Sequence, residues 1–518
     1  MNVIPSNPDR MKLKSTGPVF GKKAWTKNRR AAISEQNSMS SPLTVFGRLL
    51  LTGLAAAFPA LAPGQGLPSP EVSLSGALPA DQSWPGVSLG GNGGCVVWQD
   101  NRAGWGLAAR QLDSDGNVLG DPFRVNATAG GNPEKPQVAS LSGGGAAFVW
   151  QSGPVGFQNV YARFMGADEV FPAGDVLVSK ALYAAKISST VTWPVVRNNR
   201  VTVRRFRLIQ DIAHRRDFNA APVVSALNNG NVAVAYASYV RYTTNQPVLS
   251  GVISRRGTVW LTNSVIVSTS RVLDNMQEVF VRLFTPGGLP LGDGFIANNF
   301  SKYNQRNPSL AALPNGNFVV AWVSENQGLS DAAVSGGESR VDVYARLFDP
   351  NGLPLTDDLL VNDAALTENA TPAVASLAGG GFRVAWAQRD GDPNDGWDIV
   401  TRAFDAQGAA ASVTVRVNTH LKGDQYAPKI ASCPVGEIIV WTSLGQDGSR
   451  EGVFGRWITG GALEGTEFQV NTTTLGSQYQ QTVAASPGNR VLVGWSSINF
   501  DAQGRSLGTG FDIFGQRY

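Results

Sequence analysis

Histidine, cysteine and charged residues are scarce in this chain of 518 residues, and each scarcity narrows what the chain can do. There are two histidines and two cysteines, and Asp, Glu, Lys and Arg together make up 16% of the residues. Two cysteines are too few for a disulfide scaffold. His214 and His420 stand in no metal or triad spacing, and neither an HExxH motif nor a P-loop occurs. The sequence therefore nominates no catalytic residue.

Long hydrophobic runs are also scarce, and the one clear run lies near the N-terminus. Residues 49–62 are apolar, which is too short for a comfortable membrane span, and Arg48 and further basic residues precede them. We predict that residues 1–66 form a basic leader with a signal peptide, with Met39 as a second candidate start. The mature chain is then expected to be secreted or periplasmic, with no transmembrane span.

The positive net charge comes from this leader. Residues 1–66 contain nine Lys and Arg against two Asp and Glu, a net of +7, whereas the whole chain carries +4. Residues 67–518 are therefore left with a net of −3. That balance gives no reason to expect nucleic-acid binding.

What the sequence has in abundance is repetition. A block of about 55 residues recurs, and its clearest copy begins at Pro308 and runs to the apolar segment Phe-Val-Val-Ala-Trp322. Each copy has an alternating segment, a Gly-containing turn, an apolar run, a segment like Val-Tyr-Ala-Arg and a Val-Asn ending. The aromatic residues that end the apolar runs are Trp98, Trp150, Tyr236, Trp322, Trp386, Trp441 and Trp495. Four short strand signals in each copy predict a propeller blade.

We therefore predict an all-β fold in which residues 67–518 form a single β-propeller of four-stranded blades. The aromatics mark seven blades, and insertions at about residues 181–217 and 237–277 leave room for eight as the alternative. The last copy stops after its third strand, so Glu71–Ser75 is expected to supply the fourth and close the ring. We expect the aromatics to pack between blades; the other reading is a ring of ligand-stacking side chains.

One acidic loop stands out from the turns of the repeat. Asp390, Asp392, Asn394 and Asp398 place oxygen-bearing side chains at alternating positions. A curled loop with this spacing could surround a hard cation such as Ca²⁺, which takes six to eight oxygen ligands. We predict a metal site at these four residues. The alternative is a solvated acidic loop, because Asp, Asn, Gly and Pro also make ordinary turns.

Two resemblances accompany these patterns. The acidic loop resembles the calcium loop of integrin-type FG-GAP propeller repeats, although their Gly stands at loop position 6 and Gly396 stands at position 7. The whole repeat, over roughly residues 85–518, is similar to repeat regions of large secreted bacterial proteins. These resemblances imply a propeller in a bacterial extracellular setting, but no shared reaction.

The repeat and the leader together predict a secreted, monomeric bacterial binding protein whose ligand is a protein or a polysaccharide. The ligand is expected on the face that carries the long connections between second and third strands, because those connections differ most between copies. The alternative is an extracellular carbohydrate-active enzyme, a glycoside hydrolase or lyase, with two carboxylates about 5–9.5 Å apart. The basic insertion at 181–217 either binds an anionic polymer or forms a solvated edge.

Overall fold

The computed structural model describes most of the chain from residue 68 onward. The described backbone covers 68–128, 131–155, 157–179, 182–197, 200–256, 259–301, 303–327, 340–363, 367–390, 396–500 and 506–518, and side chains are described there outside 182–218, 240–276 and 499–509. All named elements in these ranges are β-strands, numbered β1 to β30. The expectation of an all-β fold is confirmed for this part of the chain.

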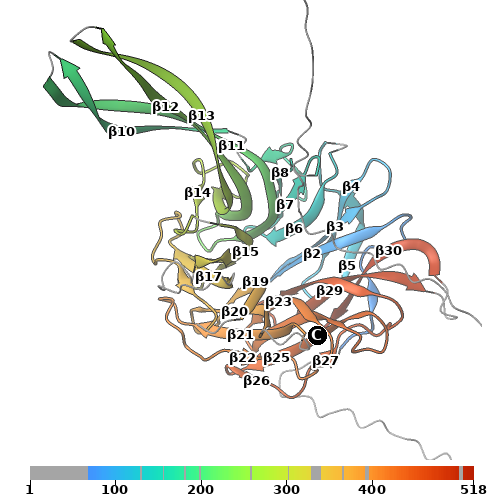
Figure 1. Ribbon diagram of the computed structural model, residues 1–518. Coiled ribbons are helices and arrows are strands. Elements are labelled where there is room, and N and C mark those ends of the chain that lie inside the picture. Colours follow the sequence, from blue (N-terminus) through green and yellow to red (C-terminus); the bar gives the residue numbers. More distant parts are fainter. Residues whose placement is uncertain are drawn as a thin grey trace, which may run out of the picture. The chain divides into compact units, whose positions relative to one another are not determined.

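The strands form six hydrogen-bonded sheets, arranged as a propeller around a ring (Figure 1). Two four-stranded sheets come first in the chain: β2 (Gln82–Gly90), β3 (Gly93–Asp100), β4 (Gly106–Leu112) and β5 (Val118–Arg124), then β6 (Glu134–Ser140), β7 (Ala146–Ser152), β8 (Asn159–Met165) and β9 (Val176–Leu177). The third sheet has five strands: β10 (Leu182–Arg197), β11 (Arg200–Ala226), β12 (Val232–Arg256), β13 (Val259–Phe284) and β14 (Phe295–Ile296).

The second half of the chain contains the larger sheets. The eight-stranded sheet holds β15 (Gln305–Ala312), β16 (Phe318–Glu325), β17 (Val341–Phe348), β18 (Leu359–Leu360), β19 (Glu368–Ser376), β20 (Phe382–Arg389), β21 (Asp398–Phe404) and β22 (Val415–Arg416). The next holds β23 (Gln425–Cys433), β24 (Gly436–Leu444), β25 (Glu451–Thr459), β26 (Ala462–Leu463) and β27 (Phe468–Gln469). The last combines β28 (Gln478–Ala485), β29 (Val491–Phe500), β30 (Ser506–Arg517) and β1 (Val72–Ser73).

The predicted blade count is wrong. The described strands make six sheets, three of which exceed four strands, in place of seven or eight separate four-stranded blades. Two successive repeat units share the eight-stranded sheet because β17 and β19 meet through one parallel bridge, Val341 to Glu368. The insertion at 181–217, one of the two that left room for an eighth blade, also forms no sheet of its own. Its residues lie in β10 and β11, which pair with each other and, through β11, with β12.

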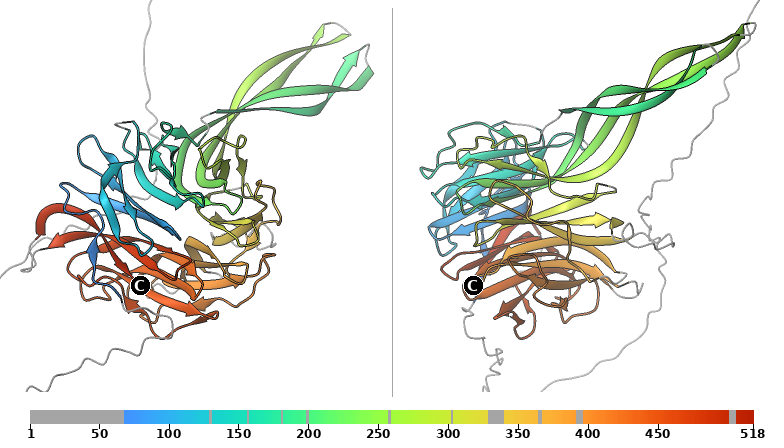
Figure 2. Two further views of the ribbon diagram at one scale, coloured as in Figure 1. Left: turned by 180° about the vertical axis from the view of Figure 1, so that it is seen from behind. Right: turned by 90° about the vertical axis from the view of Figure 1, so that its left-hand side faces the viewer.

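The insertion at 237–277 likewise differs from the expected loop. The strands β12 and β13 stay paired from Val232 and Phe284 out to Arg256 and Val259, with one register shift at Tyr239–Val240. This segment is therefore a long hairpin, which Figure 2 shows as extended paired strands.

The ring closes as the truncated last repeat predicts. Val72 of β1 pairs with Gly515 of β30, and Ser73 pairs with Phe514. Around the ring, the first strand of each repeat unit contacts the first strand of the next, in the order β2, β6, β11, β15, β19, β23, β28 and back to β2. These first strands are the innermost ones (Figure 1), and antiparallel second, third and fourth strands follow outward.

The hydrophobic core lies between neighbouring repeat units. The second strands are buried on both faces, and the predicted aromatics at their ends are at most 2% exposed. One typical cluster joins Ala233 and Val281 of the third sheet to Phe318 and Trp322 of the fourth. The prediction that the aromatics pack between blades is confirmed. Cys95 and Cys433 are buried and free, in separate clusters.

Candidate functional site

One side-chain contact recurs around the ring and explains the Val-Asn ending. The Asn Oδ1 accepts a hydrogen bond of 2.7–2.9 Å from the backbone N–H of the residue that begins the core of the third strand. The pairs are Asn126–Leu107, Asn298–Val279, Asn362–Val343, Asn418–Ile399 and Asn471–Val453. Hydroxyl groups of Ser179 and Ser75 do the same for Val160 and Ile513. The motif therefore fastens the fourth strand, and its role is structural.

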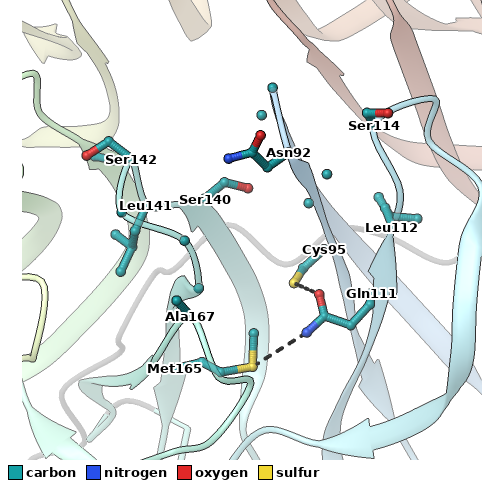
Figure 3. Close-up of a pocket in the computed structure, with 18 of the residues that line it drawn as sticks. Asn92, Cys95, Gln111, Leu112, Ser114, Ser140, Leu141, Ser142, Met165 and Ala167 are labelled. Carbon is teal, nitrogen blue, oxygen red and sulfur yellow. Dashed lines mark hydrogen bonds between the residues drawn. The ribbon is translucent and has the colours of Figure 1, made fainter.

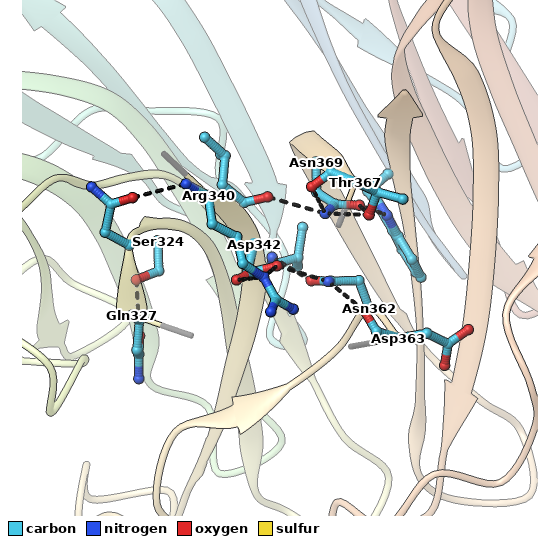
Figure 4. Close-up of polar contacts among 12 residues, drawn as sticks. Ser324, Gln327, Arg340, Asp342, Asn362, Asp363, Thr367 and Asn369 are labelled. Atoms are coloured by element: carbon cyan, nitrogen blue, oxygen red, sulfur yellow. Dashed lines mark hydrogen bonds and ion pairs between the residues drawn. The ribbon is translucent and has the colours of Figure 1, made fainter. Parts of the chain in front are cut away.

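In several repeat units the residue just before this N–H is acidic, and its carboxylate binds the same Asn. Asn362 Nδ2 donates to Asp342 Oδ1 at 2.9 Å, and Arg340 Nε lies 2.7 Å from Asp342 Oδ2, as Figure 4 shows. Asn298 Nδ2 donates to Glu278 in the same way. This position therefore supplies an acceptor that the Asn needs, since a buried amide without partners is costly.

The predicted metal ligands fall partly on this structural position. Asp390 and Asp398 line a cavity of about 320 Å³ together with Asp363, Gln388, Gly396, Val400, Thr414 and Arg416, called the acidic pocket below. Asp398 Oδ1 accepts from Asn418 Nδ2 at 2.6 Å, and its Oδ2 lies 3.4 Å from Arg416 Nη1. Asp392 and Asn394 lie outside the described residues.

These contacts explain the presence of a carboxylate at position 398 without a metal ion. The residues that the structure describes hold no group of three or more His, Cys, Asp or Glu side chains placed for a metal ion. The cation site at Asp390, Asp392, Asn394 and Asp398 stays a prediction.

A second pocket occupies the equivalent place in the second repeat unit. Ser152 pairs with Asn159 as Gln388 pairs with Asp398, and Tyr161 corresponds to Val400. This cavity of about 370 Å³, called the aromatic pocket below, is lined by Asn126, Thr128, Gly131, Pro133, Trp150, Ser152, Gly153, Pro154, Phe157, Asn159, Tyr161 and Asp175. Trp150 and Tyr161 stack with ring centroids 6.2 Å apart. The two pockets therefore share a position in the repeat but differ in chemistry.

A third feature is a bulge at one position of every innermost strand. The pairing of the first with the second strand shifts register there in each repeat unit. The bulged residue has a φ between 48° and 58° and is Trp84, Lys135, Ala221, Asn307, Thr371, Ala427 or Gln480. Such bulges re-aim side chains and are over-represented near functional sites.

These bulges lie at the end of the sheets where the second-to-third-strand connections begin. Gln82, which precedes the first bulge, pairs with Asp100, the last residue of β3. The bulged positions of the innermost strands are called the mouth below. The face that sequence analysis selected for the ligand is thus the face that carries the mouth.

Side chains at the mouth differ strongly around the ring. Trp84 is 39% exposed, and Lys135 Nζ lies 5.1 Å from the centre of its ring. The backbone N–H of Trp84 donates to Gln480 Oε1 at 2.9 Å. Tyr479 packs edge-to-face on Phe511 at 5.4 Å. The corresponding positions of two other repeat units carry Ala220 with Ala221 and Ala370 with Thr371. The mouth therefore has two sectors. The large sector carries Trp84, Lys135, Tyr426, Tyr479 and Gln480, and the small sector carries Ala220, Ala221, Ala370 and Thr371.

Two tyrosines in the large sector are poorly suited to act as bases at neutral pH. Burial, followed by the nearby charges of Glu451 and Asp424, raises the pKa of Tyr426 to about 12. Burial, Glu451 and Asp81 raise the pKa of Tyr479 as well. Both phenols stay protonated at neutral pH and can donate hydrogen bonds.

Carboxylates near the mouth are engaged by neighbouring side chains. Glu134 Oε2 accepts from Gln158 Nε2 at 3.0 Å. Glu325 lies 3.1 Å from Arg306 Nε and accepts from Asn304 Nδ2 at 2.8 Å. Both carboxylates are thus held by neighbouring side chains, and the enzyme alternative stays a prediction.

One sequence pattern marks the mouth but was not recognised as a signal for it. Proline follows the bulged residue in six repeat units, at Pro85, Pro136, Pro222, Pro308, Pro372 and Pro428. Proline has no N–H for a ladder and is confined within sheets to edges and bulges. A proline at one fixed position of an otherwise regular strand therefore marks the bulge.

A third cavity lies at the other end of the sheets. Its volume is about 1030 Å³, and its walls come from the first-to-second-strand turns near Asn92, Ser142 and Asn228 and from the third-to-fourth-strand turns. Figure 3 shows Cys95 and Met165 on its wall with Gln111 hydrogen-bonded to both. Burial, followed by the charge of Glu169, raises the pKa of the Cys95 thiol to about 12. The thiol is therefore neutral and unreactive at ordinary pH.

Comparison with known proteins confirms little beyond the arrangement of the chain. No protein-family model and no curated sequence matches it, so the resemblance to FG-GAP and secreted repeat proteins finds no support there.

Three solved structures illustrate the structural similarity. A protein of unknown function from Dyadobacter fermentans matches with TM-score 0.43 and 10% identity, over 74% of this chain and 93% of its own. An α-L-arabinanase from Penicillium chrysogenum matches with TM-score 0.40 and 11% identity, over 75% and 98%. The polysaccharide lyase Uly1 matches with TM-score 0.44 and 10% identity, over 84% and 89%. Scores and identities this low carry no argument about function.

Within the described residues, no helix is both long and apolar enough to cross a membrane.

Proposed function

We propose that this chain is a secreted binding protein that holds a polysaccharide chain against the large sector of the mouth. The observation that carries the proposal is the exposed Trp84 ring, which the bulge turns out of the strand pattern beside Lys135. An exposed indole surrounded by amide, hydroxyl and charged groups offers both an apolar face and hydrogen bonds.

The neighbouring contacts hold this surface in place before any ligand arrives. Gln480 Oε1 accepts from the backbone N–H of Trp84 and from Ser496 Oγ, both at 2.9 Å, so adjacent repeat units fix one another. Preorganised side chains lose little freedom on binding.

The test is retention by polysaccharides in native affinity electrophoresis. We expect retention of the wild-type protein by at least one neutral or acidic polysaccharide. Trp84→Ala should weaken it at least tenfold, about 1.4 kcal/mol. The matched control is Leu353→Ala, which removes a side chain 64% exposed in a third-to-fourth-strand turn, away from the mouth.

The same assay separates the alternatives. If Trp84→Ala and the wild type are retained equally, the mouth is not the binding surface. If the polysaccharide becomes shorter during incubation, the chain is an enzyme and the hydrolase or lyase alternative replaces this proposal.

A further inference from the structure

The aromatic pocket contains two hydrogen-bond donors for which the described residues provide no acceptor. The first is Trp150 Nε1. In two other repeat units the corresponding indole N–H donates to an amide on the innermost strand: Trp322 to Gln305 Oε1 at 3.2 Å and Trp386 to Asn369 Oδ1 at 2.9 Å. The residue that matches Gln305 and Asn369 in the second repeat unit is Pro133, two residues before the bulged Lys135. Its side chain has no acceptor.

The second donor is the amide of Asn159. It stands where Asp342, Asp398 and Glu278 stand in other repeat units. Its Oδ1 accepts from Ser179 Oγ at 3.2 Å and from Asn219 Nδ2 at 3.3 Å, which leaves Nδ2 without an acceptor among the described residues. Asn159 and Trp150 both line the pocket.

The remaining wall supplies an apolar face and fixed loops. Phe157 is 62% exposed at the pocket, and Tyr161 stacks on Trp150. Asp175 accepts from the backbone N–H groups of Ala127 and Thr128 at 2.8 and 3.0 Å, so its carboxylate holds one loop in place. A cavity of about 370 Å³ lies at the small end of the range for ligand pockets, suited to a small molecule or one residue of a polymer.

From these contacts we infer that the aromatic pocket is a subsite for one neutral saccharide ring. Sugar hydroxyls accept from Trp150 Nε1 and Asn159 Nδ2, and an apolar ring face lies against Phe157. The negative charge of Asp175 disfavours an acidic sugar there. This subsite rests on the proposed polysaccharide binding and deepens it, because it names a second point of contact outside the mouth.

The decisive variant is Pro133→Asn, which restores the amide that caps the indole in the repeat unit of Trp386. It should occupy the Trp150 donor from within the protein. Trp150→Phe removes the same donor and leaves a smaller aromatic ring in its place. Gln388→Ala, at the position of the acidic pocket that matches Ser152, is the matched control.

The probes are methyl glycosides of glucose, galactose, mannose and arabinose at millimolar concentration, followed by ligand-observed saturation-transfer NMR on the full-length protein. We expect at least one glycoside to bind the wild type. Pro133→Asn and Trp150→Phe should each lower that binding at least tenfold, and Gln388→Ala should leave it unchanged.

Three results would overturn the inference. No saturation transfer from any glycoside to the folded wild type means that the pocket takes no sugar. Binding that survives Pro133→Asn but is lost in Trp84→Ala places the sugar at the mouth only, and the proposed function then stands without this subsite. Stronger binding of glucuronate than of methyl glucoside means that the ligand is an anion.

Discussion

The acidic pocket and the aromatic pocket occupy the same place in two copies of one repeat, and their side chains are almost opposite in character. Asp398 of the acidic pocket corresponds to Asn159 of the aromatic pocket, and Val400 corresponds to Tyr161. The amide Asn369 on the innermost strand corresponds to Pro133. In the first, the Asp398 carboxylate accepts from both Arg416 and Asn418, so charge and amide satisfy each other. In the second, two donors remain open toward a cavity.

This difference teaches how a repeat protein can acquire a site without altering its framework. The backbone ladder and the buried aromatic are common to both copies, and the same third-strand N–H is bound by Asn418 in one copy and by Ser179 in the other. Only side chains at the end of the sheets differ, where connections vary freely. A side chain whose hydrogen bonds are all made within the protein has a structural role. When its partner is replaced by a residue that cannot form the bond, the same side chain is free to bind a ligand.

The largest expected effect tests the shared framework. Trp386→Ala should lower the free energy of unfolding by about 3–5 kcal/mol, because it removes a fully buried ring whose indole N–H is bonded to Asn369. Trp150→Phe should cost much less, because a smaller aromatic ring still fills most of the site and no described acceptor loses a partner. Urea denaturation followed by circular dichroism measures both. Equal losses would contradict the argument that packing of the ring dominates.

Next in size is a pH effect on stability at Glu278, which occupies the same position in the third sheet as Asp398 does in the acidic pocket. Burial raises the pKa of Glu278 from 4.5 to about 7, the Asn298 hydrogen bond opposes that rise, and the charge of Asp358 adds to it. The folded state therefore binds a proton more tightly than the unfolded state does. Stability from this group is fully present below about pH 4.5 and is lost as pH rises through about 7.

The loss amounts to roughly 3 kcal/mol at most. Glu278→Gln should remove this dependence and make the protein more stable at pH 8 than the wild type. Thermal unfolding between pH 4.5 and 8 is the measurement, with Asp342→Asn as the control because Arg340 pairs with Asp342. A wild-type stability that does not fall with rising pH, after subtraction of the Glu278→Gln curve, would contradict the burial argument.

A smaller effect separates structure from metal binding at Asp398. Asp398→Ala should destabilise the fold by about 1–3 kcal/mol in metal-free buffer, because Asn418 Nδ2 and Arg416 lose an acceptor. The comparison is Asp390→Ala, because no described residue donates a hydrogen bond to Asp390 and little change is expected. Chemical denaturation with a chelator present decides. A neutral Asp398→Ala would assign that carboxylate to a ligand instead of to the fold.

The smallest effect concerns the predicted Ca²⁺ site. A site with millimolar Kd would stabilise the fold by about 1.4 kcal/mol at 10 mM Ca²⁺. Asp390→Ala should abolish most of the shift in melting temperature, and Pro133→Asn, in the aromatic pocket, should leave it intact. Differential scanning calorimetry with Ca²⁺ and with Mg²⁺ checks this. A wild-type melting temperature unmoved by 10 mM Ca²⁺ would remove the site.

Sequence patterns predicted the framework better than the pockets, for a physical reason. Buried aromatics, Gly turns and the Val-Asn ending recur because each repeat unit must satisfy the same packing, so repetition exposes them. The division into sheets was not readable, since the single bridge between Val341 and Glu368 depends on how two units twist toward each other. The aromatic pocket was missed because Pro133 and Asn159 are departures from the repeat, and each alone resembles ordinary variation.

The pairing of β1 with β30 fixes when the protein can finish folding. The Ser75 hydroxyl accepts from the Ile513 N–H, and these residues are 438 positions apart along the chain. A ribosome needs roughly 20–90 s to synthesise that length. Until then the strands β28 and β29 lack their outer partners, and the ring has a free edge open to other chains. If the leader directs export, the chain can still pass through an export channel until β30 has been made, because the ring cannot close before then.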